Sequence, residues 1–257
     1  MVKNDEILRA YDNHEFLHGH SARPLRVLAE FIEPQERLAK YGISNTIVFF
    51  GSAVSVDTQT LRKRTEDGAV VAEKAMTVSK AHESCIELAR RLTVWSLQIE
   101  DPAKRFYVCS GGGPGMMEAA NRGAELGGGK SIGFNITLPF EQAINSCVSP
   151  ELGFNFHYFF IRKFWFLYYA KALIGFPGGF GTMDEIFEVL TLLQTKKIKK
   201  PVPVVLFNKE FWNDVINFKA LQEYGVVMPA DLKLFKILDD VEEAFEYITA
   251  KLKKLYL

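Results

Sequence analysis

The sequence has no surplus of charge of either sign. Lysine and arginine together number 31, aspartate and glutamate together also number 31, and the formal net charge is zero. Without a positive field over the whole molecule, we expect neither bulk binding of nucleic acid nor attraction to an anionic membrane surface. An anionic ligand therefore has to be recognised locally, by a few groups.

Cysteine is scarce and long apolar runs are missing. The three cysteines, Cys85, Cys109 and Cys147, lie far apart and are odd in number. The chain does not begin with the apolar segment of a secretory signal, so we expect a reducing, cytoplasmic location. No apolar run approaches the roughly 20 residues of a membrane-spanning helix. The hydrophobic fraction of 48% favours a globular protein with a sizeable core.

Short apolar segments alternate with helical patterns along the chain. Apolar residues recur at spacings of three and four over 69–97, 211–221 and 241–255, which predicts helices there. The predicted strands are residues 46–50, 105–109, 131–134, 172–176, 201–207 and 235–238. Since the strands are continuous apolar runs, the pattern indicates an α/β fold, with a parallel sheet covered by helices on both faces.

We expect a single domain over residues 1–257. Residues 1–45 are predicted to form a helical lead-in, residues 46–240 the core, and residues 241–257 a closing helix. The polar stretch over 54–68 has no periodicity and is predicted to be a mobile loop.

Three loops rich in glycine or small residues each follow a predicted strand. They are residues 51–53, 110–115 and 177–182. Ligands of parallel sheets bind outside the carboxyl ends of the strands, so we expect these loops to converge on one site. The third loop leads into a helix that we predict to open at Thr182, and such a helix start suits a phosphate.

Two familiar phosphate motifs do not fit these loops. The run Gly129-Lys130-Ser131 resembles the end of GxxxxGK[ST], but Ala124 occupies the position of the first glycine, and the run precedes a strand. The dinucleotide fingerprint GxGxxG fails because Glu118 and Asp184 stand where the third glycine belongs after each loop. NAD is therefore not expected.

Carboxylates follow both glycine loops, which a passive phosphate site does not need. Glu118 follows the first loop, and Asp184 and Glu185 follow the second. Since a carboxylate is repelled by a phosphate, these groups fit another part of a phosphorylated sugar, where an oxocarbenium-like transition state needs a nearby carboxylate. Two simpler interpretations stay open: Glu185 as part of a T-x-x-E capping box with Thr182, and Glu118 as a first-turn acid that complements the helix dipole.

Three segments in order, GGGPGMMEAANRGA, FFIRK and PGGFGTMDEIFE, resemble the LOG ("lonely guy") family, whose members often carry the label lysine decarboxylase. The hallmark PGGxGTxxE runs from Pro177 to Glu185, and the resemblance covers roughly residues 46–207. It implies a Rossmann-like, doubly wound α/β/α fold with extra N-terminal helices. It also implies a nucleoside 5'-monophosphate phosphoribohydrolase that releases free base and ribose 5-phosphate, needs no cofactor or metal, and forms a homodimer or larger homo-oligomer.

The resemblance also implies roles for individual residues. The family's arginine and motif glutamate map onto Arg162 and Glu185, which are expected to be catalytic. The expected substrate-binding residues are Gly51, Ser52, Gly112, Gly113, Glu118, Lys163, Gly178, Gly179, Gly181 and Thr182.

The identity of the base is left open. The chain is longer than the cytokinin-activating members, with leading helices, the 54–68 stretch and a longer segment over 133–142, and so is similar to a longer, mostly bacterial subgroup. Candidates to stack on a base are the aromatic residues Phe134, Tyr158, Phe159 and Phe180.

Two other function classes compete with hydrolysis. A nucleotide-sensing module would use the same pocket without turnover. A pyridoxal-phosphate decarboxylase would need a Schiff-base lysine, and no local arrangement marks Lys163 or Lys171 for this. For Arg162, a surface residue is the alternative interpretation.

Overall fold

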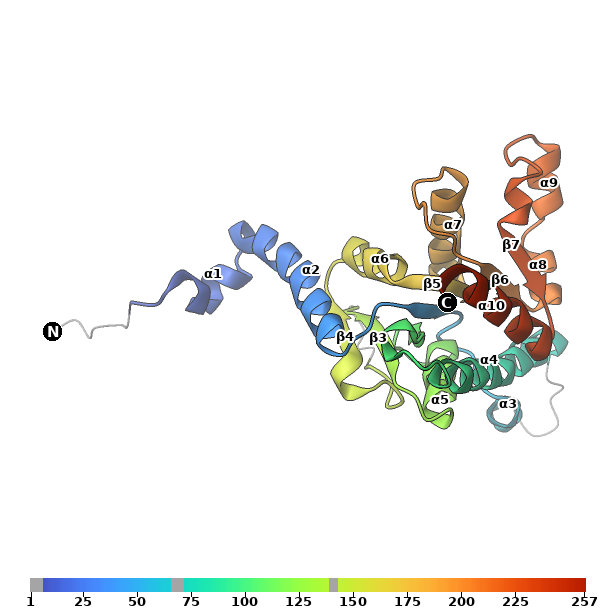
Figure 1. The fold of residues 1–257 in the computed structure, drawn as a ribbon, viewed down its shortest axis with the longest axis horizontal. Coiled ribbons are helices and arrows are strands. Elements are labelled where there is room, and N and C mark those ends of the chain that lie inside the picture. The colour runs from blue at the N-terminus through green and yellow to red at the C-terminus, as the bar shows by residue number, and fades with distance from the viewer. Residues whose placement is uncertain (1–6, 66–71, 139–142) are drawn as a thin grey trace.

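The computed structural model describes residues 7–65, 72–138 and 143–257. Seven parallel strands form one sheet in the order β4-β3-β2-β1-β5-β6-β7. In chain order the strands are β1 (Thr46–Phe50), β2 (Tyr107–Ser110), β3 (Ser131–Ile136), β4 (Gly153–Phe156), β5 (Ala170–Gly175), β6 (Val204–Phe207) and β7 (Phe235–Leu238). The expected parallel α/β class is confirmed, and Figure 1 shows helices around this sheet.

Ten α-helices and several short 3-10 turns (η) lie in the described residues. The α-helices are α1 (His14–His18), α2 (Arg23–Lys40), α3 (Thr58–Arg64), α4 (Glu73–Leu97), α5 (Met116–Leu126), α6 (Phe159–Tyr168), α7 (Phe180–Gln194), α8 (Lys209–Val215), α9 (Phe218–Glu223) and α10 (Val241–Tyr256). The 3-10 turns are η1 (Ala10–Asp12), η2 (His20–Ala22), η3 (Pro102–Lys104), η4 (Pro150–Leu152) and η5 (Asp231–Lys233).

Alternate side chains of each central strand enter two separate cores. Ile47 and Phe49 of β1 pack with buried residues of α4, α5 and α10, whereas Val48 and Phe50 pack with those of α2, α6, α7 and α8. Because side chains of a strand alternate between faces, the two cores lie on opposite faces of the sheet. The molecule therefore has the expected three layers.

The winding of the sheet reverses beside β1. The chain runs outward from β1 through β2 and β3 to β4, then returns to the other side of β1 with β5 and continues through β6 to β7. Val48 of β1 is in register with Cys109 of β2 and with Leu173 of β5. The connections that leave β1 and β5 go to opposite faces, so a crevice forms between them at the carboxyl ends.

The lead-in helices lie at one edge of the molecule. In Figure 1, α1 extends away from the sheet, while α2 lies near β4 and α6. Phe31 of α2 contacts the ring of Phe164 of α6 edge-on, and Trp165 of α6 donates a hydrogen bond to the carbonyl oxygen of Glu30 at 2.9 Å. These contacts attach α2 to α6.

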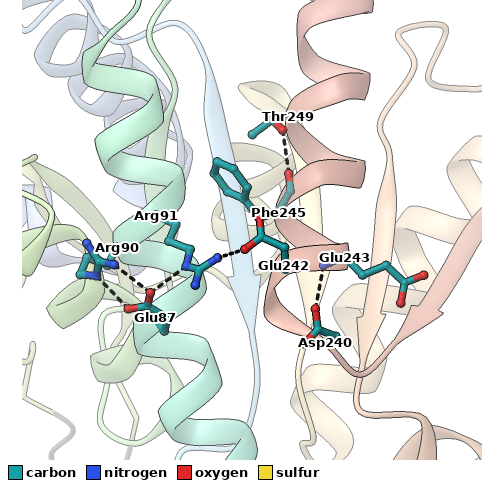
Figure 2. Close-up of polar contacts among 8 residues, drawn as sticks. All are labelled: Glu87, Arg90, Arg91, Asp240, Glu242, Glu243, Phe245 and Thr249. Carbon is teal, nitrogen blue, oxygen red and sulfur yellow. Dashed lines mark hydrogen bonds and ion pairs between the residues drawn. The ribbon is translucent and has the colours of Figure 1, made fainter.

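The closing helix is joined to the long helix α4 by charged side chains. Arg91 of α4 binds both Glu87, one turn earlier, and Glu242 of α10 (Figure 2). Asp240 accepts a hydrogen bond from the backbone N–H of Glu243 at 3.0 Å and so caps α10. Together with Arg90, Arg91 lowers the pKa of the Glu87 carboxyl to about 2, because both guanidinium groups bind it.

Several predicted boundaries are wrong. The four-residue strand β4 has no counterpart among the predicted strands, because Gly153–Phe156 is short and contains Gly and Asn. The predicted helix over 211–221 is two helices, since Ile216 is extended and Asn217 caps α9. The segment 58–64, predicted to be irregular, forms α3, whose first turn is capped by Asp57.

Two predictions fall partly outside the described residues. The end of the 54–68 stretch and the start of the predicted helix over 69–97 lie within 66–71, and the end of the long 133–142 segment lies within 139–142. In the part of the chain that the structure describes, no helix is long and apolar enough to cross a membrane. The single-domain division stays a prediction.

A substitution at Gly123 can test how closely α4 and α5 pack. A Cβ atom there would lie 2.3 Å from the carbonyl oxygen of Ile86 and 2.7 Å from the Cβ of Ala89. In an exposed helix, Gly→Ala stabilises by about 1 kcal/mol, but Gly123→Ala forces the two helices apart. We expect it to lower the free energy of unfolding by about 1–3 kcal/mol, measured by urea denaturation. Arg122→Ala on the exposed face is the control. A stabilised Gly123→Ala protein would contradict the close packing.

Candidate functional site

Three loops meet at the carboxyl ends of β1, β2 and β5. The backbone N–H of Ser52, after β1, donates to the carbonyl oxygen of Pro177 after β5 at 3.0 Å. The backbone N–H of Met116, after β2, donates to the carbonyl oxygen of Ser52 at 2.9 Å. The predicted convergence of these loops is therefore confirmed, and Ser52 links the other two.

Two glycines let the first glycine loop approach its neighbours. Gly115 has φ +70°, and a Cβ atom there would lie 2.4 Å from the carbonyl oxygen of Ser52. A Cβ atom on Gly111 would lie 2.5 Å from the sulfur of Met117 and 2.7 Å from Nη2 of Arg162. A side chain at Gly111 would thus occupy the space that the guanidinium uses.

A buried polar network holds this first loop. The Ser110 hydroxyl donates to Oδ1 of Asn121 at 2.7 Å. Nδ2 of Asn145 donates to the same oxygen at 3.0 Å and to the carbonyl oxygen of Gly113 at 2.9 Å. The backbone N–H of Asn145 donates to the carbonyl oxygen of Gly112 at 2.7 Å. Sequence reasoning missed this network, because its members come from separate segments that no local pattern connects.

The helix after the second glycine loop begins earlier than predicted. It starts at Phe180 rather than Thr182, and its N-cap residue, Gly179, makes no side-chain capping hydrogen bond. Thr182 and Glu185 therefore both lie inside the helix and are buried. The capping-box interpretation of Glu185 is wrong, since Thr182 is not the cap. The first turn of α7 leaves backbone N–H groups without partners in the helix, as every helix start does.

A pocket of about 320 Å³ opens among these loops. One side is formed by the end of β1, another by the start of α7, and a third by α6. The residues that line it are Phe50, Gly51, Ser52, Ala53, Gly111, Met117, Phe159, Arg162, Gly179, Gly181, Thr182, Asp184 and Glu185. The pocket lies beside β1 and β5, where the winding of the sheet reverses.

Arg162 reaches this pocket from α6. Its Nε donates to the carbonyl oxygen of Phe134 at 2.8 Å, and its guanidinium lies 5.1 Å from the centre of the Phe166 ring. Burial lowers the pKa of this guanidinium, an effect that the nearby Glu185 carboxylate opposes. The interpretation of Arg162 as a solvated surface residue is therefore wrong.

Glu185 is the buried acid of the pocket. Its exposed fraction is 6%. Burial raises the pKa of its carboxyl to about 7, whereas Lys163 and Arg162 favour the ionised form and Glu188 and Asp184 disfavour it. A carboxyl with a pKa near neutrality can exchange a proton with water at physiological pH, which is the property of a general base.

Lys163 points to α7 rather than into the pocket. Its ammonium group lies 2.7 Å from Asp184, 2.8 Å from Glu188 and 3.6 Å from Glu185. It is absent from the residues that line the 320 Å³ pocket. One cation therefore meets three carboxylates of the same helix.

The structure brings together most, but not all, of the predicted site residues. Those that line the pocket are Gly51, Ser52, Arg162, Gly179, Gly181, Thr182 and Glu185. Those that do not are Gly112, Gly113, Glu118, Lys163 and Gly178. Gly112 is buried against Gly133, and Glu118 lies in the first turn of α5, as predicted. The roles of all these residues stay predictions.

Other lining residues were not among the predicted site residues. They are Phe50, Ala53, Gly111, Met117, Phe159 and Asp184. Gly111 could have been found, because it is the first glycine of the loop and directly follows β2. Of the aromatic residues considered for a base, only Phe159 lines the pocket, since Phe134 and Tyr158 are buried in the core and Phe180 is exposed. In the ranges that the structure describes, no group of three His, Cys, Asp or Glu residues could hold a metal ion.

The fold and the pocket define a class: a Rossmann-like parallel α/β protein with a pocket at the reversal of its sheet, into which Arg162 and Glu185 project. A family model described as "Possible lysine decarboxylase" matches residues 117–248, slightly more than half of the chain. The chain belongs to this family, and the resemblance to LOG proteins is confirmed.

Named relatives and solved structures agree with this assignment. The chain is 28% identical over 159 residues to LOG7 of Arabidopsis thaliana, a cytokinin riboside 5'-monophosphate phosphoribohydrolase, across 56% of this chain and 71% of that protein. It is 31% identical over 127 residues to LOGL5 of Oryza sativa subsp. japonica, across 48% of this chain and 50% of that protein.

Two solved structures share the fold. The crystal structure of TM1055, a structural genomics target, matches 80% of this chain and 99% of its own with a TM-score of 0.50 and 23% identity. The molybdenum cofactor carrier protein of Chlamydomonas reinhardtii matches 82% of this chain and 99% of its own, with a TM-score of 0.50 and 20% identity. At this level of identity the two structures support the fold alone.

The burial of Glu185 makes stability depend on pH. Its pKa is about 7 when folded and 4.5 as the reference value, so the protonated form contributes stability that is complete below pH 4.5 and is lost as pH rises through 7. Glutamine cannot ionise. We expect Glu185→Gln to raise the free energy of unfolding by about 1–3 kcal/mol at pH 8 and by much less at pH 5. Urea denaturation at both pH values measures this.

The exposed Glu246→Gln on α10 is the matched control for this change. It should alter stability by less than about 0.5 kcal/mol at either pH. If Glu185→Gln were equally stable or less stable than the wild type at pH 8, the assigned burial of an ionisable acid would be wrong.

Proposed function

We propose that the protein hydrolyses the N-glycosidic bond of a nucleoside 5'-monophosphate, giving the free base and ribose 5-phosphate. One observation carries the proposal: Glu185 lies buried in a pocket that also contains Arg162 and the start of α7. The same pocket thus offers an anion site and a carboxylate of near-neutral pKa. A phosphorylated sugar needs both.

The phosphate is assigned to the second glycine loop. Gly179, Gly181 and Thr182 line the pocket at the first turn of α7. The unpaired backbone N–H groups of such a turn, at the positive end of the helix dipole, bind phosphate without a cationic side chain. A Cβ atom at Gly178 would lie 2.2 Å from Oγ1 of Thr182, so glycine there leaves room for the threonine hydroxyl to lie against the loop.

The reaction then needs one bond to break and one to form. The C1'–N bond breaks and its electron pair leaves with the base, while a water oxygen bonds to C1'. Ionised Glu185 stabilises the positive charge that develops on the ribose ring and accepts a proton from the water. The departing base takes up a proton from solvent, and Glu185 then releases its own proton to solvent, so that one water is consumed for each nucleotide cleaved. Arg162, fixed by its hydrogen bond to Phe134, lies where it can assist the leaving base.

The ribose and the base have fewer assigned contacts. Of the first glycine loop, Gly111 lines the pocket, whereas Gly112 and Gly113, predicted to do so, do not. The carbonyl oxygens of Gly112 and Gly113 accept hydrogen bonds from Asn145, which hold the loop in place. Glu118, outside the pocket lining, is a ribose ligand only if the bound substrate extends toward α5. Phe159 is the aromatic wall on which a base can stack.

The named activity of the Arabidopsis LOG proteins supports this proposal. LOG7 and LOG4 of Arabidopsis thaliana are cytokinin riboside 5'-monophosphate phosphoribohydrolases, and they are 28% and 24% identical to this chain. Identity this low supports the reaction type and leaves the base undetermined. Purine, pyrimidine and cytokinin ribotides are all candidates.

Base release from a panel of nucleotides tests the proposal. We expect chromatography to detect free base from at least one of AMP, GMP, CMP, UMP or a cytokinin ribotide. Glu185→Gln should lower the rate at least 100-fold, as expected for loss of a general base. The wild-type rate should fall about tenfold from pH 8 to pH 6, because Glu185 becomes protonated below its pKa of about 7.

Two results would overturn the hydrolase proposal. One is full activity in Glu185→Gln; the other is tight binding of a nucleotide without release of base from any member of the panel. The second result would select the alternative, a nucleotide-sensing module that uses the same pocket. The test also separates hydrolysis from decarboxylation, which would release carbon dioxide from an amino acid and leave the nucleotides unchanged.

We also propose that two copies associate through α6 and α7. Phe160, Phe164 and Tyr168 recur at every fourth residue of α6 and remain exposed by 54%, 39% and 52%. With Leu192 and Ile198 they border a groove of about 450 Å³. An apolar face of this kind on a helix marks an association surface.

Tyr168→Glu tests the association. We expect light scattering after size exclusion to give twice the mass of one chain for the wild type and the mass of one chain for Tyr168→Glu, because a buried charge without a partner disrupts an apolar interface. Tyr224→Glu, at a residue exposed by 84% that does not line this groove, is the control and should keep the wild-type mass. A monomeric wild type would contradict the proposal.

A further inference from the structure

Lys163 and Arg162 are neighbours in sequence but contact different parts of the structure. Consecutive residues of a helix point about 100° apart, and here Arg162 turns toward the carbonyl oxygen of Phe134 while Lys163 turns toward α7. Both cations act on Glu185 from α6: Arg162 lines the pocket with it, and the ammonium group of Lys163 lies 3.6 Å from its carboxylate.

The position of Lys163 is fixed by two other acids. Its ammonium group lies 2.7 Å from Asp184 and 2.8 Å from Glu188, closer than the 3.6 Å to Glu185. An ammonium group has three donors, and three carboxylates of one helix surround this one. Its side chain is only 18% exposed. Two of its donors bind Asp184 and Glu188, and Lys163 is not among the residues that line the pocket.

We propose that Lys163 is a positioning residue whose ammonium group, held by Asp184 and Glu188, favours the ionised form of the Glu185 carboxylate without touching the substrate. The inference rests on the proposed function for its kinetic consequence, but the ionisation itself can be measured without any reaction. It also reassigns Lys163, which the family resemblance had implied as a substrate-binding residue.

The charged groups around Glu185 account for the effect of Lys163. Lys163 and Arg162 lower the pKa of Glu185, and Glu188 and Asp184 raise it. The end of β1 and the start of α5 add only Phe50, Gly51, Ser52, Ala53 and Met117 to the pocket, and none of these titrates. Lys163 is therefore the cation that separates Glu185 from two like charges on its own helix.

Removal of Lys163 raises the pKa of Glu185 in two ways. Glu185 loses the attraction of a positive charge 3.6 Å away, and the repulsion from Glu188 and Asp184 is no longer compensated. An opposite charge within about 4–6 Å typically lowers a carboxyl pKa by 1–3 units. Loss of Glu188 acts in the other direction, because it removes a repulsion while Asp184 still holds Lys163.

Titration of the carboxyl group tests the inference directly. The full-length protein is labelled with ¹³C at the glutamate carboxyl carbons, and the Glu185 resonance is assigned by its absence in Glu185→Gln. We expect Lys163→Met to move the titration midpoint upward by about one pH unit and Lys163→Arg to keep it near the wild-type value. Glu188→Gln should move it downward. A merely structural disturbance would not give shifts of opposite sign.

The kinetic arm uses the same variants. If base release occurs, we expect the pH–rate profile of Lys163→Met to shift to higher pH and its rate to return to within about threefold of the wild type above the new midpoint. A rate that stays at least 100-fold lower at every pH would mean that Lys163 touches the substrate, and would overturn the inference.

The two proposals fail in distinguishable ways. Without any base release, the proposed function fails, and the carboxyl titration still decides the role of Lys163. An unshifted Glu185 midpoint in folded Lys163→Met overturns the role of Lys163 and leaves the hydrolase proposal intact. If Lys163→Met does not fold, Glu188→Gln provides the decision, because a midpoint that does not move downward overturns the inference.

Discussion

The reversal of the sheet beside β1 is the constraint on which the rest of the molecule depends. Because β5 returns to the strand that began the sheet, the connections after β1 and β5 diverge to opposite faces. The crevice between them is lined by the backbone of the glycine loops together with larger side chains such as Phe159, Arg162 and Glu185. Residues 51–53 and 177–182 face each other there, and the hydrogen bond from Ser52 to Pro177 joins them.

Within that crevice, one buried residue, Glu185, works against the stability of the fold. Glu185 is 6% exposed on a helix that also carries Asp184 and Glu188. A fold selected for stability alone would place an apolar side chain there, since an ionised carboxylate without strong partners is costly to bury. The two cations of α6, Lys163 and Arg162, favour the ionised form of Glu185 and offset part of this cost. Such local conflicts mark functional sites in otherwise consistent sequences.

Sequence patterns predicted those features that depend on neighbouring residues. The strand 46–50 and the glycine loops at 110–115 and 177–182 are local signals, and parallel topology places them at one edge.

The start of α7 was placed two residues late, because Thr182 has the sequence of a cap although Gly179 is the cap. The strand β4 is too short to show a period. The contacts of Lys163 could not be predicted because its partners lie on another helix, and the network of Asn121 and Asn145 is equally invisible to local patterns.

The backbone of Ser52 connects the loops around the site. Both of its backbone polar groups are bound, the N–H to the loop after β5 and the carbonyl oxygen to the start of α5. Neither of these two segments can shift without stretching its hydrogen bond to Ser52. At Gly115 the packing is tight, since a Cβ atom there would collide with the carbonyl oxygen of Ser52. The three loops at the carboxyl ends of β1, β2 and β5 are therefore coupled through one residue. A displacement of any one of these loops is passed to the other two through the backbone of Ser52.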